Sequence, residues 1–234
     1  MEIVYLDKNC VVVNKSPGES SEPLEPGGGA GMIGLPRLLA DALDGTEEPV
    51  AVHRIDVPVS GCVLFARNPA ALAFLSARFR AGEVEKIYWG ICETPAPGRE
   101  IPEAGEALHW LRRAGNKTIA CGEAGPGRKR ALLRYRILGR GERYLFLEIR
   151  LLTGRHHQIR AQLARLGIPV KGDLKYGARR SEKGGGIRLH ARAIAFPDPS
   201  GAAGRIIRVE APPPRPDTLW KALRDCLPLQ PKGL

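Results

Sequence analysis

The sequence predicts an α+β fold with a mixed, mostly antiparallel sheet and flanking helices and loops. Many short β-branched or aromatic runs are separated by Gly, Pro, Asn and Asp turn signals, while only a few segments have the helical period. The regular alternation of strand and helix that typifies a parallel sheet is missing. With 43% hydrophobic residues in 234, the chain can bury a sizeable core, and we expect a single domain over residues 1–234.

The first predicted unit is a hairpin, because the β-branched runs 2–6 and 10–14 flank Asp-Lys-Asn and lead into a Lys-Ser-Pro-Gly turn. The next segment is rich in Gly, Pro and Ser, and we expect a long mobile loop over residues 18–35. Its glycines lack the Gly-Lys-Ser/Thr ending of a phosphate loop, so the sequence predicts no nucleotide cofactor there.

The remaining elements follow from hydrophobic period and capping signals. Helices are expected where apolar residues recur at helical spacing behind a Pro or a capping residue, at 36–45, 68–80, 156–167 and 217–226. Strands are expected at 50–55, 62–66, 86–92, 187–196 and 205–211, with a meander of strands within 107–152.

The charge is concentrated in one segment. The chain carries 36 Lys and Arg against 25 Asp and Glu, a net +11. Residues 128–192 hold 18 of these cations and 4 of the anions, a net +14, whereas the rest of the chain is at −3. Such a local excess favours a polyanionic partner over an acidic small molecule, because neutralising phosphates releases counterions.

The composition also limits the compartment and the cofactors. No run approaches the roughly 18 apolar residues of a membrane span. The five cysteines are an odd number without a C-x-x-C pair, which predicts reduced thiols and a cytoplasmic protein. No ligand spacing matches a metal site, although four histidines are candidates: His53, His156, His157 and His190. Nothing in the sequence implies a protein partner, and we take the monomer as the default.

Asp56 is the first candidate for chemistry. It follows an apolar strand and precedes the rigid turn Val57-Pro58-Val59-Ser60-Gly61. Polar residues held at a strand end by such a turn often act on a ligand. From spacing alone, an ordinary turn-capping aspartate is the favoured interpretation of this position.

The segment around Asp56, HRIDVPVSGCVLFAR, resembles the catalytic motif of the RluA family of RNA pseudouridine synthases. A second block, LLTGRHHQIRAQLARLGIPVKGDLKYG, is similar to that family's Thr-Gly-Arg-Thr-His-Gln-Ile-Arg helix and the Gly-Asp-x-x-Tyr-Gly that follows it. Three further blocks match in order: VVVNKSPG, EKIYWGIC and IRLHARAIAFPDP. The resemblance therefore runs from about residue 11 to about residue 210.

The chain departs from the family pattern at a few positions. Ile55 stands for Leu, Val59 for the usual Thr, and His156 for Thr, and the short His-Pro continuation after Gly18 is missing. The lost Thr hydroxyl removes one hydrogen bond near Asp56, and His156 changes a potential substrate contact. Every group to which the resemblance gives a catalytic role is still present.

The resemblance implies the pseudouridine synthase catalytic fold and the isomerisation of a specific uridine in rRNA or tRNA to pseudouridine. No metal or redox cofactor is implied. A carboxylate suits the reaction as a nucleophile on the ribose C1′ or the uracil C6, or as an aid to proton removal from the ribose, and these roles stay open. The target base must be flipped out of its stack, at a cost of roughly a few kcal/mol.

Three residues receive catalytic roles from the resemblance: Asp56, Tyr88 and Arg160. Tyr88 is expected to stack on the flipped uracil, and its hydroxyl is a candidate for moving the C5 proton. Arg160 is expected to pair with Asp56 and keep it ionised. Trp89 alternates to the opposite face of its strand and is expected to be core packing.

A second group is expected to bind the substrate. Arg54 is a candidate to fill the vacated stack or hold a phosphate, and Arg155 and His157 to bind phosphate or cap the helix that follows. Contacts with the RNA backbone are expected from Lys171, Lys175 and Arg179, for which a merely solvated face is the alternative. Lys15 and Gly18 match an early turn of the family and are expected to support the site structurally.

Two rival functions agree less well with the sequence. A catalytically idle RNA-binding protein or RNA chaperone that retains the fold would also be basic, but retention of Asp56, Tyr88 and Arg160 argues against it. A deaminase or methyltransferase would need a His-x-Glu with Pro-Cys-x-x-Cys or a glycine fingerprint, and the sequence has neither. We expect no appended RNA-binding module. The sequence does not indicate which RNA or which uridine is modified.

Overall fold

The computed structural model describes residues 1–23, 34–43, 45, 48–202, 204–214 and 217–226. Its strands are β1 (Glu2–Leu6), β2 (Cys10–Lys15), β3 (Val50–Ala51), β4 (Ser60–Ala66), β5 (Glu85–Glu93), β6 (Ala104–Ala114), β7 (Lys117–Cys121), β8 (Lys129–Arg140), β9 (Tyr144–Leu151), β10 (Leu189–Pro197) and β11 (Ile206–Glu210). Its helices are α1 (Leu35–Ala42), α2 (Pro69–Ala81), α3 (Gln158–Arg165) and α4 (Thr218–Asp225), with a 3₁₀ turn η1 at Leu174–Tyr176.

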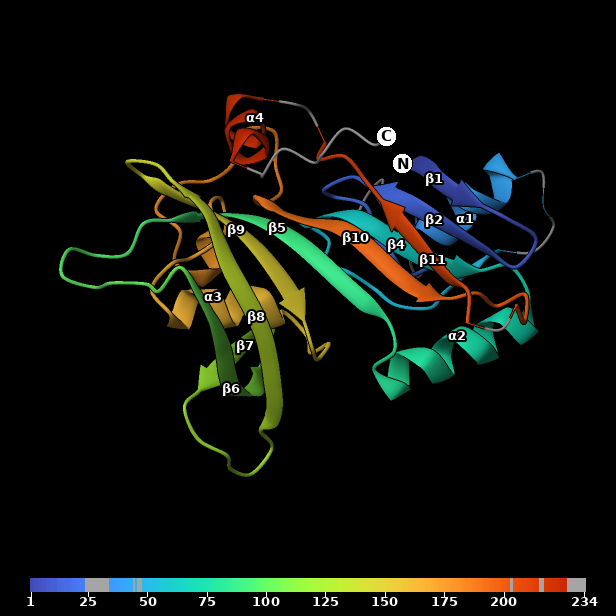
Figure 1. Cartoon of the computed structure of the whole chain (residues 1–234), viewed down its shortest axis with the longest axis horizontal. Helices are drawn as coiled ribbons and strands as arrows, with labels where there is room; N and C mark the ends of the chain where they lie inside the picture. The colour runs from blue at the N-terminus through green and yellow to red at the C-terminus, as the bar shows by residue number, and fades with distance from the viewer. Residues whose placement is uncertain (24–33, 44, 46–47, 203, 215–216, 227–234) are drawn as a thin grey trace.

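The strands of the described residues form one sheet in the order β1-β2-β4-β10-β5-β9-β8-β6-β7, with β3 paired to β4 and β11 to β10 (Figure 1). Among these strands, β10 and β4 form the one parallel pair, through His190 opposite Ser60 and Ala191 opposite Gly61. The prediction of an α+β fold with a mixed, mostly antiparallel sheet is confirmed.

The centre of the sheet is buried on both faces. In β4, Val63 and Phe65 belong to one hydrophobic cluster and Cys62 and Leu64 to another, as alternation along a strand requires. A strand covered on both sides reads as a continuous apolar run, which is why β2 and β4 are recognisable in the sequence.

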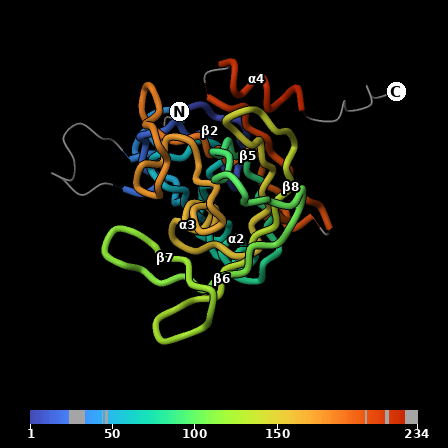
Figure 2. The backbone as a smooth tube through the Cα atoms, turned by 90° about the vertical axis from the view of Figure 1, so that its left-hand side faces the viewer, coloured from blue at the N-terminus to red at the C-terminus, as the bar shows by residue number. Residues whose placement is uncertain are grey.

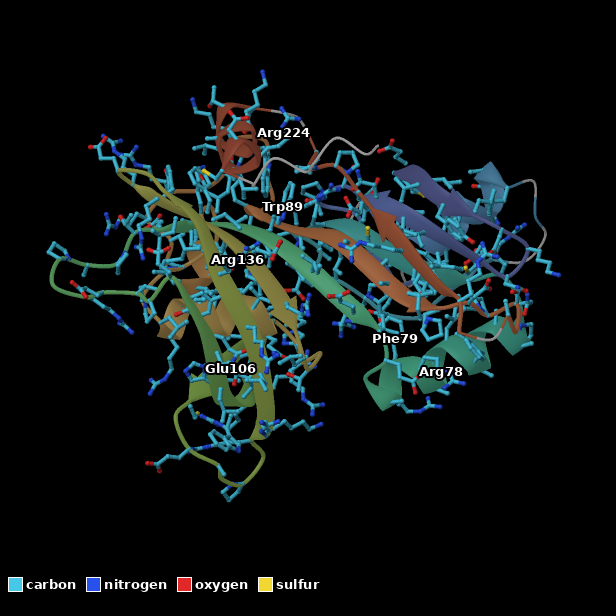
Figure 3. All side chains as sticks on the ribbon, in the orientation of Figure 1. Arg78, Phe79, Trp89, Glu106, Arg136 and Arg224 are labelled. Carbon is cyan, nitrogen blue, oxygen red and sulfur yellow. The ribbon has the colours of Figure 1, made fainter. Side chains whose placement is uncertain are left out.

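Each helix covers a defined part of the sheet. The core side chains of α3, Ile159 and Leu163, pack in the cluster that contains Tyr88, whereas Leu75 of α2 packs on the other face of β4. Helix α4 covers Trp89 of β5 through Trp220, so the prediction that Trp89 is core packing is confirmed (Figure 3). The hairpin β6–β7 extends from the body of the molecule beside α3 (Figure 2). Within the described residues, no helix has the length and apolarity needed to cross a bilayer.

Two predicted boundaries were wrong. The strand expected over residues 50–55 ends at Ala51, because Leu64 donates its N–H to the ring Nε2 of His53 at 3.1 Å instead of to a backbone carbonyl. The chain leaves the sheet there. The helix expected from residue 156 begins at Gln158, because His157 has a left-handed backbone with φ of 50°.

The predicted loop at 18–35 is described only at its ends, since residues 24–33 lie outside the described part of the chain. At these ends Ser20 and Ser21 are buried, and Leu35, the first residue of α1, donates its N–H to the carbonyl of Ser20 at 2.9 Å. The flanks of the segment therefore pack against the domain.

Candidate active site

Asp56 lies in the turn between β3 and β4, and hydrogen bonds from the end of β2 and the segment after it hold this turn in place. The carbonyl of Asp56 accepts from the N–H of Val59 at 2.9 Å, and the carbonyl of Val57 accepts from Gly18 N–H at 2.8 Å. The fully buried ammonium of Lys15 also donates to Val57 O at 3.0 Å, and to the carbonyls of Ser16 and Glu19. Lys15 and Gly18 therefore fix the position of the turn that carries Asp56.

Arg160 joins Asp56 to a second carboxylate. From the buried face of α3, Arg160 donates from Nη1 to Asp56 Oδ2 at 3.0 Å. Its Nε and Nη2 donate to the two oxygens of Asp173 at 2.6 and 2.9 Å. Burial by itself would lower the pKa of Arg160, but its bonds to Asp173 and Asp56 raise that pKa above the ordinary value. Arg160 is therefore a permanent cation whose direction is fixed by Asp173.

Tyr88 reaches the same pocket from β5. Its side chain lies on the face of the sheet that α3 covers, and only 6% of the residue is exposed. Burial and then the charge of Asp56 raise the pKa of the Tyr88 hydroxyl well above its usual range. Tyr88 thus keeps its phenolic proton near neutral pH.

The pocket has a volume of about 460 Å³ and is lined by residues from several elements. Asp56, Tyr88 and Arg160 form one part of its wall, with Arg54 and Arg155 nearby. A neighbouring pocket of about 320 Å³ shares Asp56 and Arg160 and adds Lys175. Among the described residues that line the larger pocket, Asp56 is the one carboxylate and the other charged side chains are cations. Glu22 is a second carboxylate in the smaller pocket.

His157 borders Asp56 on the side of α3. Its Nε2 lies 3.8 Å from Asp56 Oδ2, and its Nδ1 forms a hydrogen bond of 2.8 Å with the hydroxyl of Tyr176. That hydroxyl accepts from Thr118 N–H at 2.8 Å, and the His156 ring stacks on His157 at 3.8 Å. Burial lowers the pKa of His157 to about 4, so the ring is neutral at pH 7. These contacts hold the strained backbone of His157 in place.

The structure brings together four of the residues expected to bind substrate. Arg54, Arg155 and His157 line the larger pocket, and Lys175 lines the smaller one. Arg54 is exposed and donates from Nη1 to the carboxylate of Glu22 at 2.6 Å, so Glu22 competes with an RNA phosphate for this guanidinium.

Lys171 and Arg179 are placed elsewhere. The ammonium of Lys171 is paired with Glu182 and is largely buried, and Arg179 lies 3.5 Å from Glu93. Neither lines the two pockets that contain Asp56. Lys171 is therefore neutralised by a carboxylate of the same basic segment, whereas the Arg179 side chain is 73% exposed and makes only a loose surface pair with Glu93.

Three residues of the site were not predicted from the sequence. Asp173 and Tyr176 belong to the GDLKYG block, which carries part of the resemblance, but their contacts with α3 depend on tertiary structure. Thr118 lies on β7, and its hydrogen bonds to Tyr176 and to His156 have no local signature. Within the described residues, no group of three or more His, Cys, Asp or Glu side chains is arranged to hold a metal ion.

Comparison with known proteins matches residues 9–165 to the model of the RNA pseudouridylate synthase family. An uncharacterised RNA pseudouridine synthase of Zymomonas mobilis subsp. mobilis is 31% identical over 91% of this chain and 94% of its own. The dual-specificity RNA pseudouridine synthase RluA of Vibrio cholerae is 28% identical over 85% of this chain and 78% of its own.

Two solved human structures share the fold. RNA Pseudouridylate Synthase Domain Containing 1 has a TM-score of 0.73 at 24% identity, covering 96% of this chain and 86% of that one. Domain Containing 4 has a TM-score of 0.72 at 21% identity, covering 96% and 92%. These two structures show the fold alone. The family match and the sequence relatives identify the chain as a member of the RluA-type family of RNA pseudouridine synthases, isomerases that convert uridine in RNA into pseudouridine.

Proposed function

We propose that this enzyme isomerises a specific uridine in rRNA or tRNA and that Asp56, Tyr88 and Arg160 perform the reaction. The observation that carries the proposal is the geometry around Arg160, which holds Asp56 at 3.0 Å while Asp173 fixes its other two nitrogens. The arrangement presents one oriented carboxylate to a pocket that also contains a protonated tyrosine.

In the reaction the bond between N1 and C1′ breaks, C5 joins C1′, the proton leaves C5, and the ring nitrogen gains one. The flipped uracil stacks on the ring of Tyr88, and Asp56 acts on the sugar or the base next to it. Attack on C1′, attack on C6 and proton removal from the ribose are all open to a carboxylate at this position. In each case Arg160 keeps Asp56 ionised and aimed.

Substrate binding relies on cations at the border of the two pockets. Arg54 fills the space left by the flipped base or holds a phosphate once it leaves Glu22, while Arg155 and Lys175 hold the RNA backbone. Their location beside Asp56 supports this role. Lys171 contributes less to RNA binding, because its charge is buried and paired with Glu182, whereas the exposed guanidinium of Arg179 remains accessible to the RNA backbone outside these pockets.

The enzyme acts as a monomer in the cytoplasm in this proposal. The cysteines are free, and three of them, Cys10, Cys62 and Cys92, are buried. Burial raises the pKa of Cys10 and Cys62 to about 12, which makes these thiols inert. Such thiols suit a reducing compartment.

The test is to map pseudouridines in total RNA from the host, with and without the gene, and to incubate the RNA that lacks the modification with purified protein. We expect one or a few positions in rRNA or tRNA to lose pseudouridine without the gene and to regain it in vitro. An unchanged map, together with protein that binds RNA and converts no uridine, would favour the idle RNA-binding protein instead.

A further inference from the structure

The active-site pocket has lining residues to which the proposed reaction gives no role. Lys86 and Phe79 line it, together with His53. Phe79, near the end of α2, lies next to the start of β5, the strand that carries Lys86 (Figure 3). Lys86 Nζ is 5.7 Å from the centre of the Phe79 ring, and that ring stacks on His53 at 5.0 Å.

Lys86 has no carboxylate partner among the described residues, in contrast to the other buried cations near it. Its neighbour Glu85 points to the opposite face of β5, where it pairs with Arg150 at 2.7 Å and Arg208 at 3.5 Å. Burial lowers the pKa of Lys86 below its ordinary value. A half-buried cation without a counter-charge is unfavourable, so an anion supplied by a ligand would relieve it.

The groups around Lys86 are neutral. His53 accepts the Leu64 N–H at Nε2, and burial lowers its pKa to about 3, so it carries no charge at pH 7. On the other side lies Gly154, where a Cβ would be in ordinary van der Waals contact with Nζ, at 3.7 Å. Next to Phe79 and His53, Lys86 supplies the charged group, and Arg113 and Arg155 border the same pocket.

The position of Lys86 fits a nucleotide placed for the proposed reaction. Lys86 and Tyr88 are two residues apart on β5 and therefore on the same face, with Cα atoms separated by about 7 Å. A uridine whose uracil lies on Tyr88 and whose C1′ lies at Asp56 has a phosphate one sugar away from the base. Lys86 lines the same pocket as Tyr88 and Asp56, and its long side chain places a charge within it.

We propose that Lys86 is a substrate-binding residue that pairs with a phosphate directly attached to the flipped uridine. This inference rests on the proposed function, since it takes the pocket to hold the target nucleotide. It adds a contact on the inner wall of the pocket, so that the enzyme recognises the nucleotide by its base and its charged linkage together.

The test is a ligand-observed NMR titration with three probes: uridine, uridine 5′-monophosphate and uridine 3′-monophosphate. We expect the wild-type enzyme to bind one of the monophosphates about tenfold or more tightly than uridine, as one charge-assisted hydrogen bond provides. Lys86→Met should remove this preference and Lys86→Arg should keep most of it. Lys8→Met, in the exposed turn between β1 and β2, is the matched control and should behave as wild type.

Two results would overturn the proposal. One is a wild-type enzyme that binds all three probes equally; the other is Lys86→Met that weakens uridine and the monophosphates by the same factor, which would place the amine on the base or sugar. A melting curve checks that each variant is folded. If Lys86→Met is not folded, Lys86→Arg still provides a variant for the titration. The titration measures binding and needs no turnover. The proposed function is tested separately, by uridine conversion with the wild-type enzyme, so the failure of one can be told from the failure of the other.

A second arm uses the RNA that the wild-type enzyme converts. Two versions of this RNA are made, one with a single neutral methylphosphonate linkage on the 5′ side of the target uridine and one with it on the 3′ side. For one of the two positions we expect the KM of the wild type to rise about tenfold and the KM of Lys86→Met to be unaffected by the same linkage. Equal losses in the two enzymes at both positions would contradict the pairing.

Discussion

Asp173 holds the guanidinium of Arg160 by two hydrogen bonds, from Nε at 2.6 Å and from Nη2 at 2.9 Å, and leaves Nη1 free to donate to Asp56. Asp173 itself is buried and lines neither pocket that contains Asp56. A carboxylate outside the reaction space therefore determines where the cation inside it points. Asp173 is a positioning residue in this account.

Asp173→Ala should lower both stability and activity. Removing one partner of a buried ion pair costs about 3–5 kcal/mol, because the remaining charge loses its compensation. We expect a loss of this order in the free energy of unfolding in urea, and a lower kcat because Arg160 is no longer aimed. Asp41→Asn is the control: it breaks the exposed pair with Arg37, whose N–O distance is 3.1 Å, and should cost less than about 1 kcal/mol. Equal effects of the two substitutions would show that Asp173 does not hold Arg160.

Tyr176→Phe should loosen His157. The hydroxyl of Tyr176 accepts the buried Thr118 N–H at 2.8 Å and bonds to His157 Nδ1 at 2.8 Å. Without it, an unsatisfied N–H costs about 1–3 kcal/mol of folding stability. We expect that loss in urea unfolding together with a several-fold lower kcat, because the His157 ring next to Asp56 is no longer held. Tyr144→Phe removes a hydroxyl with no hydrogen-bond partner among the described residues and should leave both quantities unchanged. A kcat equal to that of Tyr144→Phe would contradict the role given to His157.

Lys175 and Lys171 should differ in their effect on RNA binding. Lys175 borders the pocket with Asp56, whereas the ammonium of Lys171 is paired with Glu182. Each phosphate contact adds about one to the slope of log K against log salt. We therefore expect Lys175→Ala to flatten that slope by about one and Lys171→Ala to leave it within error, measured by titrating RNA at several salt concentrations. The reverse order would show that the RNA follows a different face.

Acid should destabilise the fold through His190. The side chain is fully buried, with Nε2 donating to the carbonyl of Ala211 and Nδ1 accepting from the Ser60 hydroxyl, both at 2.9 Å. Burial lowers its pKa to about 4, compared with 6.5 for the unfolded chain. Between these values the unfolded state binds the proton and the folded state does not, so stability is full above pH 6.5 and falls as the pH is lowered towards 4. The loss from this histidine is about 2 kcal/mol at pH 5.

His190→Gln isolates this contribution. The variant should be less stable than wild type at pH 7, because the pair of buried hydrogen bonds is altered, but it should lose less on going to pH 5. Urea unfolding at the two pH values measures the difference. If both proteins lost the same free energy, His190 would not be the group responsible.

The sequence predicts best where the cause of a structure is local. Asn68 before Pro69 predicts the start of α2, and in the structure its side chain accepts the N–H of Ala71. Asp217 caps α4 in the same way, through the N–H groups of Leu219 and Trp220. The strands with both faces buried are equally visible, because their apolar runs do not depend on the partner strand.

The sequence predicts poorly where the cause is a tertiary contact. Lys171 looks like any other cation of a basic segment until Glu182 is seen folded against it. His157 has a left-handed backbone because contacts from Tyr176 and His156 hold its ring, and no local pattern reports this. The resemblance located Asp56, Tyr88 and Arg160, but the role of Asp173 required the structure.

Pseudouridine formation by Asp56→Asn tests the central claim most directly. Asparagine keeps the shape of the side chain and removes its charge, so RNA binding should stay within about threefold of wild type. We expect wild-type enzyme and the Asp41→Asn control to convert uridine in RNA that lacks the modification, with pseudouridine measured by liquid chromatography of the nucleosides, and Asp56→Asn to form none. Conversion by Asp56→Asn at the wild-type rate would contradict the assignment of Asp56 as the catalytic carboxylate.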